Sequence, residues 1–271
     1  MKAILLNSTE HYHSGCKAVM DKINSMLPNN FKKYHVKNAI GIQWHPSWDD
    51  ADIIILNGEG TMHHSADRPA TQGLLEIVKE AQRRGITTIL INSLWQDIEE
   101  KYTEVVQNLD YFSVRDVLSQ QHATEVHGRS PDLFLDLSYT KQHIDRNPNG
   151  KIGVGRLFSG HLDLDGNVCD IFTHPWPELI QIIADSDLLV TGRHHEMYAA
   201  CIAKTPFVVY EGNSWKNQGL LVTADVEIPV LSWDKHKQLT EDDYRKIVED
   251  HQNQYEKLFD FMENYPESLQ F

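Results

Sequence analysis

Positive charge is scarce in this 271-residue chain, which has 25 lysines and arginines against 39 aspartates and glutamates and a formal net charge of -14. Such an acidic field repels nucleic acid and anionic membrane surfaces. Basic residues cluster no further than Lys32-Lys33 and Arg83-Arg84. We therefore expect no nucleic-acid partner, and we expect any anionic ligand to be held by a few buried, positioned cations.

Cysteine and long apolar runs are also scarce. The chain has three cysteines, Cys16, Cys169 and Cys201, and no Cys-x-x-Cys pair, which argues against a disulfide framework or a structural zinc site. Apolar runs such as 53–56 are far shorter than the roughly 20 residues that cross a bilayer. Residues 1–7 indicate a first strand, not a signal peptide. We expect a cytoplasmic protein with no membrane span.

Buried strand patterns alternate with amphipathic helix patterns along the chain. Strands are predicted at 2–6, 52–56, 87–91, 111–114, 151–154, 188–190, 207–210 and 226–231. Helices are predicted at 15–27, 71–84, from about 115, and at 175–184, 194–203 and 240–264. This alternation predicts an α/β protein with parallel sheets.

A polar stretch with proline and glycine at 140–150 is predicted to be an interdomain linker. The prediction is therefore two Rossmann-like lobes, residues 1–144 and 145–271, with a cleft between them. Ligands of such sheets bind beyond the carboxyl ends of the strands. Residues that directly follow strands are thus the best site candidates.

The strongest candidate is the segment 191–197, which follows a buried strand and opens a helix. A helix N-terminus offers free N–H groups to an anion, and Arg193, His194 and His195 add a forked cation and imidazoles. The alternative is an arginine in a structural ion pair with two capping histidines. Adjacent histidines on a helix cannot both face one ion and no third ligand stands at a useful spacing, so no metal is expected.

Two segments of the first half are weaker candidates. Arg115 emerges directly after a short strand, and its alternative reading is an ordinary Arg–Asp pair at a helix start. The loop 57–61 places Glu59 between Gly58 and Gly60, followed by Thr61, where backbone can approach a ligand and a carboxylate can act as acid or base. The alternative there is a plain strand-to-helix turn.

Two further loops follow predicted strands. The loop 11–17 carries His13, and the segment 210–219 offers Asn213 as a polar anchor and Lys216 as a cation. Solvated loop histidines are the simpler interpretation of the first. Cys16 and Cys201 have no evident base partner in the sequence and are interpreted as small packing residues.

Together these segments resemble the polysaccharide pyruvyltransferase family. The strand-end loop 57–61, the Arg-Asp-x-x-Ser segment 115–119 and the segment 190–216 match the family's order and spacing. In the last segment, the most specific one, the matching positions are Arg193, His195, Pro206 and Lys216. Two positions depart from the family pattern: Glu59 stands in place of a glycine, and Glu196 follows His195 where a small residue is usual.

The resemblance implies a fold similar to the GT-B glycosyltransferases and transfer of a pyruvyl group from phosphoenolpyruvate to two hydroxyls of a sugar or glycan, with no cofactor. It implies that Arg115, Arg193 and His195 hold the donor's phosphate and carboxylate. His195 or Glu59 is the expected acid/base. Two alternatives remain: a GT-B glycosyltransferase that uses a nucleotide sugar, and a non-catalytic sugar- or anion-binding relative.

Overall fold

The structure is a computed structural model that describes residues 1–37, 40–158 and 160–266. The chain divides into two compact units. The first comprises Met1–Thr9 and Met20–Asp136, and the second comprises Glu10–Val19 and Leu137–Phe271. This division changes unit at Leu137, not at a single boundary after residue 144, and it groups a short N-terminal segment with the second unit.

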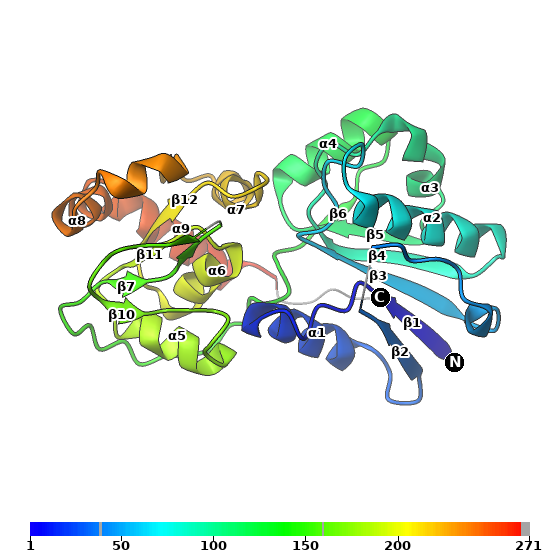
Figure 1. Ribbon diagram of the computed structural model, residues 1–271, viewed down its shortest axis with the longest axis horizontal. Coiled ribbons are helices and arrows are strands. Elements are labelled where there is room, and N and C mark those ends of the chain that lie inside the picture. The colour runs from blue at the N-terminus through cyan, green and yellow to red at the C-terminus, as the bar shows by residue number, and fades with distance from the viewer. Residues whose placement is uncertain (38–39, 159, 267–271) are drawn as a thin grey trace. The chain divides into compact units, whose positions relative to one another are not determined.

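The first unit is built on a six-stranded parallel sheet with the strand order β2-β1-β3-β4-β5-β6 (Figure 1). Its strands are β1 (Lys2–Leu6), β2 (Lys32–Val36), β3 (Ile53–Glu59), β4 (Thr87–Ser93), β5 (Tyr111–Val114) and β6 (Asp132–Leu133). Its helices are α2 (Pro69–Arg83), α3 (Thr103–Gln107) and α4 (Val117–His127). Helix α1 (Ser14–Met26) is divided between the units, because its residues up to Val19 belong to the second unit and those from Met20 belong to the first. The core lies between the sheet and these helices, where one apolar cluster includes Ile4, Ile54, Leu74 and Leu90.

The second unit has a five-stranded parallel sheet with the order β10-β7-β11-β12-β13 (Figure 1). Its strands are β7 (Gly153–Val154), β10 (Asn167–Val168), β11 (Leu189–Thr191), β12 (Phe207–Tyr210) and β13 (Val230–Leu231), and an antiparallel pair, β8 (Arg156–Leu157) and β9 (Gly160–His161), follows β7. Its helices are α5 (Trp176–Ala184), α6 (His194–Ala203), α7 (Lys216–Thr223), α8 (Glu241–Asp250) and α9 (Gln252–Asn264).

Both units repeat one strand order. When the strands of each large sheet are numbered along the chain, the first five lie in the order 2-1-3-4-5 in both sheets. In the second sheet β7 is the first strand and β10 the second, because β8 and β9 form a separate pair. In such sheets the connections leave in opposite directions from the first and third strands, and this switch point is where doubly wound folds bind ligands. The switch lies between β1 and β3 in the first unit and between β7 and β11 in the second. The predicted α/β class and parallel sheets are confirmed.

Several predicted elements change. Strand β3 continues through Glu59, where it pairs with Ser93 of β4, so residues 57–59 are strand and not loop. The single helix predicted at 240–264 is two helices that meet at His251, and β13 forms only the last part of the strand predicted at 226–231. Sequence reasoning missed β2 and α7, because β2 is a half-exposed edge strand rich in lysine and α7 has little amphipathic pattern.

The polar stretch 140–150 forms no helix or strand and is part of the second unit, within which it packs. The Arg146 guanidinium donates to the backbone carbonyl of Asp187 at 2.9 Å, and Arg245 of α8 donates to the carbonyl of Gly150 at 2.9 Å. Within residues 1–37, 40–158 and 160–266, no helix is both long and apolar enough to cross a membrane.

Candidate functional site

The second unit places Arg193 at the N-terminus of α6, directly beyond the switch strand β11. Arg193 is the N-cap residue, with extended backbone angles of φ -106° and ψ 125°. Its N–H donates to the Thr191 hydroxyl at 2.9 Å, which fixes the turn from strand to helix. The backbone N–H groups of the first helical turn and the positive end of the helix dipole therefore lie beside this side chain.

The Arg193 guanidinium is held by backbone and aromatic rings and not by a carboxylate. Its Nη2 donates to the carbonyl of Phe158 at 3.0 Å, and its Cζ lies 5.6 Å and 5.3 Å from the ring centroids of Phe158 and Phe172. No carboxylate in the described part of the chain lies within ion-pair distance of it, although the buried Glu196 is close enough to interact electrostatically. Its buried Nε has no hydrogen-bond partner among the described residues. The alternative of a structural ion pair at Arg193 is therefore not what the structure contains.

Lys216 and Asn213 gather around the same phenylalanine. The Lys216 ammonium lies 5.7 Å from the Phe158 ring centroid and donates to the Asn213 side-chain oxygen at 3.0 Å. A cavity of about 270 Å³ next to Lys216 is lined by Phe158, Asn213, the half-exposed Trp233 and the acidic residue Glu211, among others; Arg193 and Lys216 are not among its lining residues. We call the two cations Arg193 and Lys216, together with the amide of Asn213, the cation cluster. Two cations beside aromatic rings and an open cavity suit a small anion that carries further polar groups.

Glu196, one of the two positions that depart from the family pattern, is fully buried and holds the loops at this end of the sheet together. Its carboxyl group accepts from the backbone N–H groups of Arg156 at 3.0 Å and Ile171 at 3.2 Å, and from the Thr191 hydroxyl. Burial raises the pKa of Glu196 to about 7, against the opposing effect of these hydrogen bonds and of Arg193. Gly155 makes room for it, because a Cβ there would lie 2.2 Å from Glu196 Oε2.

The two histidines of α6 face different neighbours. The His195 ring lies 5.0 Å from the His13 ring, whereas the His194 ring lies 4.8 Å from the ring of the core residue Tyr198. Gly15 permits the first arrangement, because a Cβ at that position would lie 2.6 Å from His195 Cβ. His195 and His13 therefore form one group, and His194 packs toward the core.

In the first unit the candidate residues lie at the carboxyl ends of β3 and β5, and β1 and β4 are the neighbouring strands. The Glu59 carboxylate is buried and accepts from the Asn57 side-chain amide at 3.1 Å and from the Thr9 hydroxyl. Glu59 has a positive φ of 38°, and Asn7 and Asn92 at the ends of the neighbouring strands have φ values of 58° and 54°. Such conformations are costly for residues other than glycine and cluster at functional sites.

The glycines on either side of Glu59 have different surroundings. A Cβ on Gly58 would lie 2.3 Å from Ser93 Oγ, so glycine is required there by close packing against β4. At Gly60 the nearest group to a Cβ is Nη2 of Arg115, at 3.9 Å. Thr61 closes the turn by donating its N–H to the Gly58 carbonyl at 3.0 Å. The segment 58–61 therefore brings open backbone next to a guanidinium.

Arg115 is buried with 1% of its surface exposed, and its Nη1 donates to Asp136 Oδ2 at 2.6 Å. Asp116 is not its partner, since the Asp116 carboxylate caps α4 by accepting from the N–H of Ser119 at 2.8 Å. Nε and Nη2 of Arg115 are buried and have no hydrogen-bond partner among the described residues. A buried guanidinium with two unused donors suits an anionic oxygen that the polypeptide does not supply.

The structure thus gathers the predicted site residues into two groups, one in each unit. The first unit holds Gly58, Glu59, Gly60, Thr61 and Arg115, and the second holds His13, Arg193, His194, His195, Asn213 and Lys216. Sequence reasoning missed the partners of these groups, namely Asn7, Thr9, Asn92, Asp136, Phe158 and Phe172. An asparagine directly after a buried strand is the signal that could have pointed to Asn7 and Asn92.

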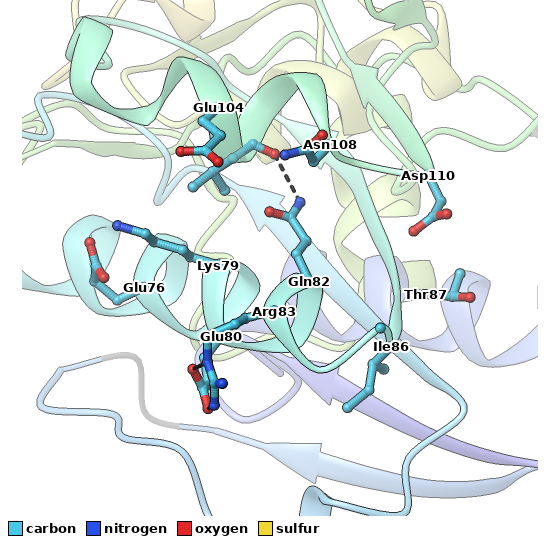
Figure 2. Close-up of a pocket in the computed structure, with 12 residues that line it drawn as sticks. Glu76, Lys79, Glu80, Gln82, Arg83, Ile86, Thr87, Glu104, Asn108 and Asp110 are labelled. Carbon is cyan, nitrogen blue, oxygen red and sulfur yellow. Dashed lines mark hydrogen bonds and ion pairs between the residues drawn. The ribbon is translucent and has the colours of Figure 1, made fainter.

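A larger cavity of about 690 Å³ lies elsewhere in the first unit, between α2 and α3 (Figure 2). It opens beside Thr87 and Asp110, which precede or begin β4 and β5, so it lies at the amino ends of these strands. The Gln82 side chain bridges the two helices by donating to the carbonyl of Val105 at 2.9 Å, and Figure 2 shows the dashed line that leaves Gln82 toward the other helix. Parallel sheets bind ligands at the opposite end, so the candidate site is not assigned here.

Comparison with protein families gives a match to the polysaccharide pyruvyl transferase model over residues 4–214. The chain therefore belongs to the polysaccharide pyruvyl transferase family, which is a family of transferases. A comparison with curated proteins finds no match.

Among solved structures, a functionally uncharacterised protein from Klebsiella pneumoniae is similar at a TM-score of 0.51 and 10% identity, with 80% of this chain and 86% of that chain covered. This likeness shows the fold alone. UDP-GlcNAc 2-epimerase from Methanocaldococcus jannaschii matches at a TM-score of 0.47 and 11% identity, with 100% and 95% covered. An alpha-glucosyltransferase in complex with UDP matches at 0.47 and 10%, with 98% and 96% covered.

Proposed function

We propose that this protein transfers a pyruvyl group from phosphoenolpyruvate to two hydroxyls of a sugar or glycan, forming a cyclic ketal and releasing phosphate. The observation that carries the proposal is the Arg193 guanidinium at the start of α6. It has no carboxylate partner among the described residues and lies in a cluster with Lys216, in a chain whose net charge is -14. Membership of the family supports the reaction class.

We assign the donor to the second unit. The cation cluster and the N–H groups of the first α6 turn would hold the phosphate and carboxylate oxygens, because a forked guanidinium binds two oxygens at once. His195, which follows Arg193 by two residues in the first turn of α6, is the proposed proton donor. In the first unit, whose part we propose to be the acceptor side, Glu59 is the second candidate acid/base, and Arg115 has donors for an anionic oxygen.

The proposed reaction adds two acceptor hydroxyls to one carbon of the donor and releases phosphate. A proton is delivered to the methylene carbon of the enolpyruvyl group, which makes its C2 electrophilic. A sugar hydroxyl attacks C2 and loses its proton. The C–O bond to phosphate breaks and phosphate leaves with the electron pair, and a second hydroxyl then closes the ketal and loses its own proton. The cations stabilise negative charge on the departing phosphate, where loss of one such contact typically raises the barrier by about 2.7–4 kcal/mol.

The test is the release of inorganic phosphate from phosphoenolpyruvate in the presence of a panel of sugar acceptors. Replacing Arg193→Ala is expected to lower turnover roughly 100- to 1,000-fold while the melting temperature changes little. Lys246→Ala, which removes an exposed cation of α8 in the same unit, is the matched control and should keep full activity. Retained activity with a large loss of stability in Arg193→Ala would contradict the proposal.

The nucleotide-sugar alternative is separated by ligand-induced thermal stabilisation, since a ligand that binds only the native state raises the melting temperature. We expect stabilisation by phosphoenolpyruvate, reduced in Arg193→Ala. Stabilisation by nucleoside diphosphates and not by phosphoenolpyruvate would favour a glycosyltransferase. Binding of phosphoenolpyruvate without phosphate release from any acceptor would favour a non-catalytic relative.

A further inference from the structure

Three potential metal ligands that are distant in sequence meet within the second unit. His13 lies just before α1, Cys16 lies in its first turn, and His195 lies in the first turn of α6. One ligand atom from each of the three lies within 4.8 Å of the others. Cys16 and His195 are 2% and 7% exposed, and His13 is only half-buried, which leaves a route to solvent.

The two segments that carry these side chains are tied together by backbone. The carbonyl of Ile171 accepts from both the N–H and the hydroxyl of Ser14, at 3.2 and 3.1 Å. The N–H of the same residue donates to Glu196 Oε1 at 3.2 Å. Ile171 therefore links the start of α1 to the residue after His195, and Gly15 lets the His195 ring approach closely. The geometry is set by packing and does not depend on a bound ion.

We propose that His13, Cys16 and His195 bind a zinc ion. Imidazole nitrogen and thiolate sulfur are the ligands that zinc prefers, whereas magnesium and calcium prefer oxygen. Three protein ligands leave the fourth tetrahedral position for water or a substrate atom, which is the pattern of an open site. The inference does not depend on pyruvyl transfer, because it rests on the donor atoms and their convergence. It shares His195 with the proposed function, so in the zinc-bound form His195 is a ligand and Glu59 remains as the candidate acid/base.

Zinc binding would move one proton within the His13 ring and release another from the Cys16 thiol. Without metal, Nδ1 of His13 accepts from the Cys16 N–H at 3.2 Å, so the neutral ring carries its proton on Nε2, 3.3 Å from Cys16 Sγ. For zinc to bind at Nε2, that proton moves to Nδ1 and the capping hydrogen bond is given up. The thiol proton is released to solvent, since the thiolate is the metal ligand.

The test uses Co²⁺ as the spectroscopic probe and Zn²⁺ as the competitor, on the full chain under reducing conditions. We expect one equivalent of Co²⁺ to give a thiolate-to-metal charge-transfer band and the visible bands of a four-coordinate ion, both removed by one equivalent of Zn²⁺. Cys16→Ser and His13→Ala are each expected to weaken Co²⁺ binding by more than the 10- to 100-fold that loss of an outer-shell partner causes.

Cys201→Ser is the matched control, because Cys201 is another buried cysteine in the same unit, 3% exposed, outside the three-residue group. It should keep the spectrum and the affinity. Urea denaturation checks that each variant folds, and His13→Ala carries the test if Cys16→Ser does not fold. A wild-type chain without the charge-transfer band, or binding that neither substitution weakens, would overturn the proposal and leave a histidine–thiol hydrogen bond as the role of the group.

Discussion

The buried carboxyl group of Glu196 makes the stability of this protein depend on pH. Burial raises its pKa from 4.5 to about 7, because the charged form loses more hydration than its hydrogen bonds from Arg156, Ile171 and Thr191 return. Between these two pKa values the folded chain binds more protons than the unfolded chain at this position. The free energy of unfolding therefore falls as the pH rises through this window, and the decrease is complete above about pH 7.

The size of the effect follows from the shift. A difference of one pKa unit corresponds to about 1.4 kcal/mol, so the rise from 4.5 to about 7 corresponds to a loss of about 3 kcal/mol across the window. That is a substantial part of the roughly 5–15 kcal/mol that stabilises a typical folded protein. Glu196→Gln removes the titrating group while keeping the size of the side chain.

The assay is urea denaturation of the wild type and the variant at a series of pH values from 4 to 8. The difference in unfolding free energy, wild type minus Glu196→Gln, is expected to decline by about 3 kcal/mol between pH 4.5 and 7 and to stay level above that. Glu178→Gln, which changes an exposed glutamate of α5, should leave the wild-type slope in place. Parallel profiles for the wild type and Glu196→Gln would refute the reasoning.

Two further predictions concern packing and charge. Arg115→Met leaves the carboxylate of Asp136 buried without its cation and should lower the unfolding free energy by about 3–5 kcal/mol, measured by urea denaturation; a change below about 1 kcal/mol would mean that the pair is not buried as described. Gly155→Ala places a Cβ against Glu196 Oε2 and should destabilise by about 1–3 kcal/mol in the wild type, but by less in Glu196→Ala, where that contact is gone. Strictly additive effects of the two substitutions would contradict the second prediction.

The candidate site was partly readable from the sequence. Arg193, Asn213 and Lys216 all follow strands, and the structure brings them around one ring, Phe158. Ligands of parallel sheets bind at the carboxyl ends of the strands, so candidate residues can be found once the end of each strand is located in the sequence. The strand-end loop 57–61 was found in the same way, although its first residues turned out to continue β3.

The partners of these residues could not be predicted. Arg115 pairs with Asp136 and not with the adjacent Asp116, and Glu196 accepts from backbone at Arg156 and Ile171. No periodicity or spacing links such positions, since their proximity follows from strand order and from how the loops pack. For the same reason, no sequence spacing indicates that His13 and Cys16 lie near His195.

The sequence by itself determined much of the local structure of this protein, with β2 and α7 among the exceptions. Buried apolar runs and amphipathic spacing specify strands and helices, and their alternation specifies parallel sheets, so that α6 and β12 begin and end at the predicted residues. Tertiary structure alone decided that the segment Glu10–Val19 joins the second unit and brings His13 and Cys16 to His195. The physical reason is range: hydrophobic periodicity acts over a few residues, whereas these contacts are fixed by the packing of elements that are far apart in the chain.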